Sequence, residues 1–392
     1  MSTEAYLNRG VSPTKEDVHK AIANQSQGIF PGSFCKIIED TMGNPDYCTA
    51  MHADGAGTKS ILAYLHFKET GDTSVFRGIA QDSIVMNIDD LLCVGDVNNF
   101  VVSNTIGRNA HRINGMILKE IIEGYEDFAN NMKKYNVNMI MAGGETADIG
   151  DLVSTVIVDS TVFVRILRNK VINCANIKPG NVIVGLASSG KATYENSFNS
   201  GISSNGFTAA RHLILCKDYA RKYPETFSNT IDMGNVYCGK YKMEDKLPNS
   251  SQTVGQALLS PTRTYLPIIR EVVSKHFDSI NGIIHCTGGG QVKCKSFGSK
   301  LHYIKDNLFD IPAIFELIKN ESEITSKEMY QVFNMGHRLE IYCDSNSAND
   351  IIEISQKYNV EAKIIGRVEA NCDDNCNNKV TIIDGDNEYI YI

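Results

Sequence analysis

Residues 49–59 combine the residue types that phosphate chemistry uses. The sequence Thr-Ala-Met-His-Ala-Asp-Gly-Ala-Gly-Thr-Lys predicts a short apolar strand that delivers an aspartate into a glycine loop. The glycines let a phosphate approach backbone N–H groups, the lysine brings positive charge, and a carboxylate suits magnesium. The spacing is not that of a Walker loop, and an ordinary strand-to-loop turn is the alternative interpretation. The residues expected to face a nucleotide are Asp54, Gly55, Gly57, Thr58 and Lys59.

A helix with three acids is expected over residues 77–93. Its apolar stripe repeats at helical spacing and consists of Ile84, Val85, Ile88, Leu91 and Leu92. Asp82 and Asp89 lie about two turns apart and flank this stripe, while Asp90 projects roughly 100° further round. Such acids usually form a solvated face. Because no basic residue stands one turn away to neutralise them, the pattern favours an ion site.

A second strand ends in glycines and an acid. Residues 137–142 read as a buried strand that stops at Gly-Gly-Glu-Thr-Ala-Asp, residues 143–148. If the two strand ends meet the acidic helix, many carboxylates cluster, which requires cations between them or raised pKa values. Magnesium ions that bridge the phosphates of a nucleotide would meet this need. The clustered acids would be Asp54, Asp82, Asp89, Asp90, Glu145 and Asp148.

The second half repeats the plan of strand and glycine loop. A turn at residues 176–181 predicts a boundary between an N-terminal domain, 1–177, and a C-terminal domain, 178–392. A strand over 182–187 runs into Ser-Ser-Gly, and the Ser-Asn-Gly before the next helix suits either a phosphate or an ordinary helix cap. His285 follows another strand and precedes three glycines, so it is either a proton carrier or a structural histidine.

Composition limits the function classes. A chain of 392 residues is expected to form two domains. The net charge of -8 gives no support to a nucleic-acid or anionic-membrane surface. The 11 cysteines include no C-x-x-C pair, which fits a reducing compartment. With neither a signal-like N-terminus nor a bilayer-length apolar run, the sequence predicts a soluble cytoplasmic protein with no membrane partner.

Eight motifs in order resemble aminoimidazole ribonucleotide synthetase, also called phosphoribosylformylglycinamidine cyclo-ligase, of de novo purine synthesis. No motif is decisive alone, but the ordered set spans most of the chain. The motifs are His52-Ala-Asp-Gly-Ala-Gly-Thr-Lys59, Ile88-Asp-Asp-Leu91, Gly143-Gly-Glu-Thr-Ala-Asp148, Gly185-Leu-Ala-Ser-Ser-Gly190, Ser204-Asn-Gly-Phe207, Leu258-Leu-Ser-Pro-Thr-Arg263, His285-Cys-Thr-Gly-Gly-Gly290 and Met329-Tyr-Gln-Val-Phe-Asn-Met-Gly336.

The resemblance implies an α/β (α+β) protein with the two-domain fold of ATP-dependent synthetases of this type. It also implies a homodimer whose N-terminal strands form a barrel across the dimer, and the use of ATP, Mg2+ and formylglycinamidine ribonucleotide. In such enzymes ATP phosphorylates the formyl amide oxygen to an iminophosphate. The amidine nitrogen then closes the imidazole ring and expels phosphate.

Residue roles follow from the matching positions. The implied metal ligands are Asp54, Asp89, Asp90 and Glu145. The implied nucleotide contacts add Gly55, Gly57, Thr58, Lys59, Asp82, Gly143, Gly144 and Thr146. The implied substrate contacts are Ser188, Ser189, Gly190, Ser204, Asn205, Gly206, Thr287, Gly288 and Gly289. The expected catalytic residues are Asp54, Lys59 and His285.

Four departures from the family pattern leave alternatives open. The N-terminal Gly-Phe-Gly flap is reduced to residues 31–34, residues 191–202 separate the two serine loops, Ser203 replaces a histidine, and 293–297 replace Glu-Asn-Ile-Pro. Sister enzymes are one alternative: a thiamine monophosphate kinase, a selenophosphate synthetase or a hydrogenase-maturation dehydratase. Their own signatures match less well. A non-catalytic nucleotide-binding protein is the other, although clustered acids without cations would destabilise its fold.

Overall fold

The first part of the chain forms a five-stranded mixed sheet. The computed structural model describes residues 8–9, 16–95, 97–372 and 377–392. The strand order is β1-β2-β5-β3-β4, and only β3 and β4 are parallel neighbours. The strands are β1 (Ile37–Glu39), β2 (Tyr47–Gly55), β3 (Asn99–Arg108), β4 (Asn138–Asp148) and β5 (Val156–Leu167). The helices are α2 (Glu16–Ile22), α3 (Lys59–Thr70), α4 (Phe76–Leu91) and α5 (Gly115–Lys133).

The rest of the chain forms a seven-stranded sheet of order β12-β11-β8-β10-β6-β9-β7. Within it only β8 and β11 are parallel neighbours. Its strands are β6 (Val182–Ala187), β7 (Ile280–His285), β8 (Leu301–Lys305), β9 (His337–Cys343), β10 (Ala362–Ala370), β11 (Lys379–Asp384) and β12 (Asn387–Tyr391). Its helices are α6 (Phe207–Ile214), α7 (Asp218–Lys222), α8 (Val254–Leu258), α9 (Leu266–His276), α10 (Ala313–Asn320), α11 (Ser326–Val332) and α12 (Ala348–Lys357).

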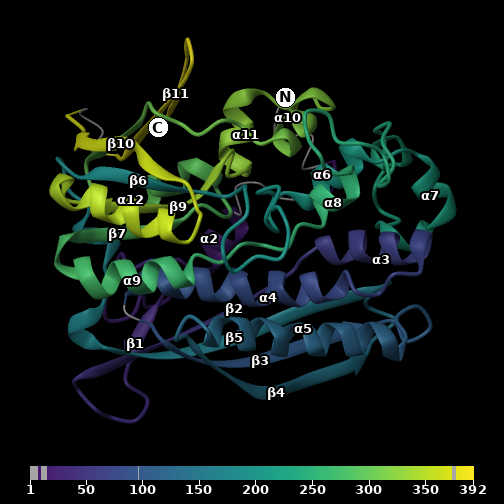
Figure 1. Ribbon diagram of the computed structural model, residues 1–392, viewed down its shortest axis with the longest axis horizontal. Coiled ribbons are helices and arrows are strands. Elements are labelled where there is room, and N and C mark those ends of the chain that lie inside the picture. The colour runs from purple at the N-terminus through teal and green to yellow at the C-terminus, as the bar shows by residue number, and fades with distance from the viewer. Residues whose placement is uncertain (1–7, 10–15, 96, 373–376) are drawn as a thin grey trace.

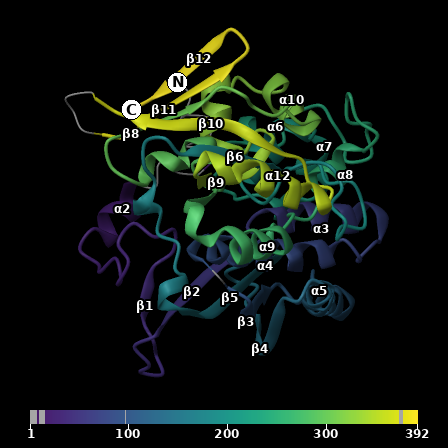
Figure 2. The ribbon, with the colours of Figure 1, turned by 60° about the vertical axis from the view of Figure 1, so that its left-hand side comes forward.

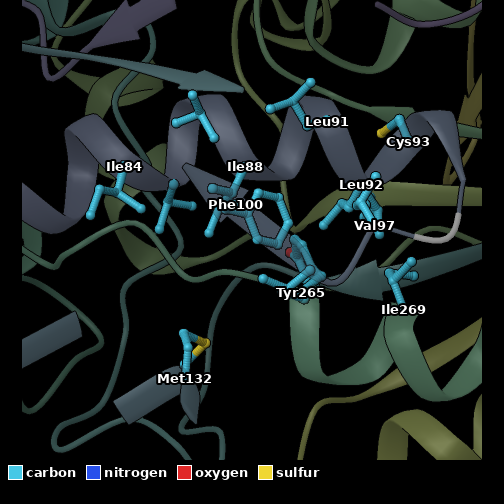
Figure 3. Close-up of a cluster of buried hydrophobic side chains, with 14 of the residues drawn as sticks. Ile84, Ile88, Leu91, Leu92, Cys93, Val97, Phe100, Met132, Tyr265 and Ile269 are labelled. Atoms are coloured by element: carbon cyan, nitrogen blue, oxygen red, sulfur yellow. The ribbon is translucent and has the colours of Figure 1, made fainter. Parts of the chain in front are cut away.

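Helix α4 lies where the two halves of the molecule meet. In Figures 1 and 2 the first sheet and α5 occupy the lower half, the second sheet and α12 the upper half, and α4 and α9 run between them. The apolar stripe expected on this helix is fully buried. Figure 3 shows Ile88 of α4 beside Phe100 of β3, with Tyr265 of the loop before α9 next to that ring. One hydrophobic cluster therefore contains side chains from both halves.

The mixed α and β architecture confirms the predicted fold class, and several elements lie where the sequence places them. The acidic helix expected over 77–93 is α4, and the strand expected over 182–187 is β6. The strands of the two sheets separate between residues 167 and 182, whereas the domain boundary at 177/178 stays a prediction. The sequence Ser-Pro-Thr-Lys-Glu-Asp at residues 12–17 predicts a helix start; α2 begins at Glu16, and residues 12–15 lie outside the described residues.

The prediction for β4 is wrong in two respects. The strand does not stop at residue 142 but continues through the glycines to Asp148, with a register shift against β3 at that point. It is also not buried, since every residue of β4 is exposed or half-buried. The physical reason is that β4 is an edge strand of a sheet whose helices cover only one face, so its apolar residues have no second layer above them.

The packing of α5 against α4 gives a test of this arrangement. A Cβ atom on Gly124 of α5 would lie 2.8 Å from Cα of Arg77 and 2.9 Å from its carbonyl oxygen. We expect Gly124→Val to lower the free energy of unfolding by about 1–3 kcal/mol, because the two helix backbones must separate. Denaturation by urea measures this loss. Gly115, in the same helix, has no such neighbour within 4 Å, so Gly115→Ala should not destabilise the protein. Equal stability of the two variants would contradict the close helix contact.

Candidate active site

Asp82 and Lys59 form a buried ion pair. Nζ of Lys59 lies 2.8 Å from Oδ1 of Asp82, and neither side chain is exposed to solvent. The same ammonium donates to the carbonyl oxygens of Ser203 at 3.2 Å and Ser260 at 2.6 Å. Burial lowers the pKa of Lys59, and the charge of Asp82 opposes this shift. Since an ammonium has three N–H donors, all of them are used inside the protein. This geometry suits a positioning role for Lys59 better than the predicted contact with phosphate.

Asp89 is also enclosed by partners from other parts of the chain. Its Oδ1 accepts a hydrogen bond from the Thr264 hydroxyl at 2.6 Å, and its Oδ2 lies 3.2 Å from Nη2 of Arg338. Oδ2 also accepts from the backbone N–H of Tyr265 at 3.3 Å. Burial raises the pKa of Asp89 to about 7, although Arg338 and Thr264 act in the opposite direction. Both carboxylate oxygens are thus engaged, and the side chain is not exposed.

Asp90 lies between two histidines. Its Oδ1 is 2.6 Å from Nδ1 of His285, and its Oδ2 is 3.3 Å from Nε2 of His52. The other ring nitrogen of His52 lies 3.0 Å from Oδ1 of Asn87. Burial raises the pKa of Asp90, but the hydrogen bond from His285 and the charge of Lys293 outweigh this effect, so the pKa lies below its ordinary value. Asp90 is 7% exposed, so this carboxylate is accessible from the surface.

His285 is buried and neutral at pH 7. Burial lowers its pKa to about 4, against the hydrogen bond and charge of Asp90. In the neutral ring Nδ1–H donates to Asp90, and Nε2 has no hydrogen-bond partner among the described residues. The ring therefore holds Asp90 through one nitrogen and keeps the other without a partner among the described residues.

Asp54 ends β2 on the side of the sheet that α4 covers. Its register partner on β5 is Ser160, whose hydroxyl lies 3.0 Å from that of Ser83 on α4. Residues paired across a sheet share a face, so Asp54 lies on the helix side together with His52. The Asp54 carboxylate accepts a hydrogen bond from the Gly55 N–H at 2.7 Å and is exposed. Asp54 therefore lies on the same face of the sheet as His52, whose ring contacts Asp90.

Glu145 lies on the opposite face and three strands away. The register pairs Gly55 with Asp159, Asp159 with Thr105, and Thr105 with Glu145. With a strand spacing of about 4.8 Å, β4 lies roughly 14 Å from β2 across the sheet. The predicted loop Gly143, Gly144 and Thr146 belongs to this exposed edge strand. Within one chain the structure therefore does not bring Glu145 next to Asp54.

Residues 191–202, which separate the two serine loops in the sequence, fold back on the first loop, and a Cβ on Gly201 would lie 2.6 Å from the Ser188 hydroxyl. The backbones of Gly190 and Asn199 form two hydrogen bonds, of 3.0 and 2.7 Å. The Ser188 hydroxyl donates to Asn334 at 2.8 Å. Within the intervening segment, Glu195 pairs with the buried Arg263 at 2.6 Å. Arg263 in turn donates to the carbonyl oxygens of residues 187 and 189, so the insertion helps to fix the first serine loop.

The remaining predicted substrate contacts line two neighbouring turns. The Ser204 hydroxyl lies 3.1 Å from that of Thr262, and Oδ1 of Asn205 is buried with no partner among the described residues. Gly206 has φ of 76°, and a Cβ there would lie 2.4 Å from the Phe333 ring, so this turn requires glycine. In the triple-glycine turn, Thr287 is buried whereas Gly288 and Gly289 are exposed.

Sequence reasoning missed several residues of this site. His52 lies in the first motif and Asn87 in the acidic helix, but neither was predicted as a site residue. Arg338 is too distant in the sequence to be linked with α4. Asp159 interrupts an apolar strand, which is a usable signal, and its pKa is raised by burial and by the charge of Asp54. Lys293 falls in a segment that departs from the family pattern.

Family models cover most of the chain. The model described as AIR synthase related protein, N-terminal domain, matches residues 35–165, and the corresponding C-terminal domain model matches residues 178–376. The chain belongs to the AIR synthase related family. The resemblance inferred from the ordered motifs is thereby confirmed.

Relatives in this family carry the name that the motifs indicated. The phosphoribosylformylglycinamidine cyclo-ligase of Methanocaldococcus jannaschii is 30% identical over 93% of this chain and 91% of its own length. The cyclo-ligase of Thermoplasma volcanium is 28% identical over 87% of this chain and 84% of its own. These names confirm the prediction of a ligase.

Two solved structures share the fold of this chain at low sequence identity. One from a HypE–HypF complex has a TM-score of 0.55 at 11% identity and covers 97% of this chain and 99% of that chain. AaThiL complexed with AMPPCP and TMP has a TM-score of 0.52 at 9% identity, and the match covers 97% of this chain and 96% of that chain. They support the fold alone. Among the described residues no helix is long and apolar enough to cross a membrane.

The Lys59–Asp82 pair gives a test of the buried charge network. We expect Lys59→Met to lower the free energy of unfolding by about 3–5 kcal/mol, because it leaves the Asp82 charge buried without a counter-charge. Thermal or urea unfolding measures the loss. Lys68 lies on the exposed end of the same helix, so Lys68→Met should cost less than about 0.5 kcal/mol. If Lys59→Met lowered the free energy of unfolding no more than Lys68→Met does, the ion pair would not hold α3 against α4.

Proposed function

We propose that this protein catalyses the ATP-dependent ring closure of formylglycinamidine ribonucleotide to aminoimidazole ribonucleotide, with release of ADP and phosphate. The observation that carries this proposal is the match to proteins named cyclo-ligase over more than nine-tenths of the chain. The insertion between the serine loops folds back on the first loop, because Gly190 and Asn199 pair through their backbones and Gly201 packs against Ser188. The names of the relatives do not favour the sister activities or the non-catalytic alternative. A cytoplasmic location, which the scattered free cysteines fit, is part of the same proposal.

The nucleotide and its metal would bind at the Asp54 and Asp90 carboxylates. Their oxygen donors are of the type that Mg2+ prefers, and Asp54 is exposed and Asp90 slightly so, whereas Asp89 is fully buried. When bound, Mg2+ would neutralise charge on the nucleotide phosphates. The protein itself orients Asp90 through His52 and His285, and the glycine loop after β2 offers backbone N–H groups to phosphate oxygens. Asn205 and the Ser188–Gly190 loop would hold the substrate phosphate.

A homodimer completes the proposal. The open face of the first sheet carries a row of paired apolar residues, Met51, Phe163, Val101 and Ile140, which runs across four strands to the edge strand β4. Met51 is 65% exposed and Ile140 52% exposed. A one-sided sheet with an apolar open face and an unpaired edge is suited to association with a second copy. In such a dimer the N-terminal strands would form the expected barrel, and Glu145 would lie near the partner chain.

The function is tested by a coupled assay with formylglycinamidine ribonucleotide, ATP and magnesium. We expect ADP and the aminoimidazole product in equal amounts. ADP without imidazole would favour a sister phosphotransferase, and bound ATP without either product would favour the non-catalytic alternative. As a control, Asp54→Asn should lower turnover by at least about tenfold, because phosphoryl transfer depends on positioned metal ligands. The exposed Asp278, far from the site at the end of α9, serves as a matched variant, Asp278→Asn, with unchanged turnover.

The dimer is tested by sedimentation velocity at several protein concentrations. The wild-type chain of 43.3 kDa is expected to sediment as a dimer. The double variant Val101→Glu/Ile140→Glu should sediment as a monomer, because two charges in the half of the apolar row next to the sheet edge resist burial. Leu152, 84% exposed in the loop after β4, provides the control variant Leu152→Glu, which should remain dimeric. A monomeric wild type, or a dimeric double variant, would exclude this surface as the interface.

A further inference from the structure

The segment after the triple glycine places a lysine beside the candidate active site. Residues Gly290–Ser296 form a 3-10 helix, and Nζ of its half-buried Lys293 donates to the Thr287 hydroxyl at 2.7 Å. The same ammonium lies 4.4 Å from the centre of the Phe34 ring, within the range of a cation–π contact. Lys293 is thus held between the triple-glycine turn and the N-terminal loop.

Lys293 differs from the other cations around α4. Lys59, Arg338 and Arg263 each pair with a carboxylate, of Asp82, Asp89 and Glu195 respectively. Among the described residues Lys293 has no ion-pair partner within 4.0 Å and donates to a neutral hydroxyl instead. It nevertheless lies beside the site, because Thr287 is two residues from His285, whose Nδ1 lies 2.6 Å from Oδ1 of Asp90. On its other side, Phe34 precedes Cys35, whose thiol lies 3.3 Å from the carbonyl oxygen of Asp90. A cation that is positioned but not neutralised is available to a bound anion.

The position of Lys293 is built by tertiary contacts. A Cβ on Gly290 would lie 2.4 Å from the carbonyl oxygen of Tyr330, so this turn packs against α11 without room for a side chain. The Gln291 side chain donates to the carbonyl oxygen of Asn334 at 2.8 Å. On the other side, the rings of Phe34 and Phe297 stack with centroids 5.5 Å apart. The backbone that carries Lys293 is therefore fixed at both ends.

We propose that Lys293 is a catalytic residue that contacts the transferring phosphoryl group through its ammonium. This inference rests on the proposed function. In the first step the substrate amide oxygen bonds to the γ-phosphorus, the amide N–H proton passes to solvent, and the bond to ADP breaks with its electron pair leaving on ADP. In the second, the amidine nitrogen bonds to the imidate carbon, its proton passes to the departing phosphate, and the carbon–oxygen bond breaks with its electron pair leaving on that phosphate. Lys293 stays protonated throughout and offsets the negative charge on the phosphoryl oxygens. It supplies the cation that the buried Lys59 cannot.

The test compares nucleotides with and without the γ-phosphate. Binding of AMPPCP and of ADP, each with magnesium, is measured by titration calorimetry on the full chain. Lys293→Gln should weaken AMPPCP binding by about 10- to 100-fold, the loss expected for a hydrogen bond to a charged group, and leave ADP binding unchanged. Lys293→Arg should retain most of the AMPPCP affinity, because it keeps the charge.

The controls separate a contact from a structural effect. Lys295 lies in the same 3-10 helix, but its ammonium donates to the carbonyl oxygen of Ile392 at 2.8 Å, so Lys295→Gln should bind both nucleotides as the wild type does. Equal loss of AMPPCP and ADP in Lys293→Gln, or no loss of either, would overturn the proposal. In the coupled assay Lys293→Gln should lower kcat. If the wild type forms no aminoimidazole, the cyclo-ligase proposal fails, whereas the nucleotide comparison still decides the contact of Lys293 with the γ-phosphate.

Discussion

Three carboxylates on one buried helix are the constraint on which this structure depends. An isolated charge costs several kcal/mol in a protein interior unless a counter-charge or strong donors reach it. Each acid of α4 meets this requirement through a different element: Asp82 through Lys59 of α3, Asp89 through Arg338 of β9, and Asp90 through His285 of β7. Since β7 and β9 belong to the second sheet, the charge network joins the two halves of the molecule, as the apolar cluster also does.

The departures from the family pattern compensate one another in space. The shortened N-terminal loop and the altered segment after the triple glycine meet through the stacked rings of Phe34 and Phe297. The insertion between the serine loops contributes Glu195, which neutralises Arg263. Arg263 donates to the carbonyl oxygens of Ala187 and Ser189 and so fixes the backbone of the first serine loop. Changes that look independent along the chain therefore affect the same site, which is consistent with a retained activity.

Local patterns predicted much of the fold and part of the site. The stripe of α4, the strand β6 and the glycine turns follow from residues within one helical turn or one strand, and the sequence contains that information. The partners of the acids do not follow from local patterns. Lys59, His285 and Arg338 lie 23, 195 and 249 residues in the sequence from the acids that they contact. A search for basic residues one turn along the helix could not find them. The exposure of β4 was missed for a similar reason, because an apolar run predicts burial only when a second layer covers it.

The position of Glu145 limits how the predicted metal ligands can act together. Magnesium binds oxygen at about 2.0–2.1 Å, so two carboxylates that share an ion must bring their oxygens within roughly 4 Å. Asp54 and Glu145 lie on opposite faces of a sheet and three strands apart, and no rotation of their side chains closes that gap. If both residues bind one magnesium ion, they must come from different chains. The open apolar face beside Glu145 is where a second copy would approach. The dimer and the metal site are therefore coupled: a monomer could assemble the Asp54 and Asp90 part of the site but not the part that includes Glu145.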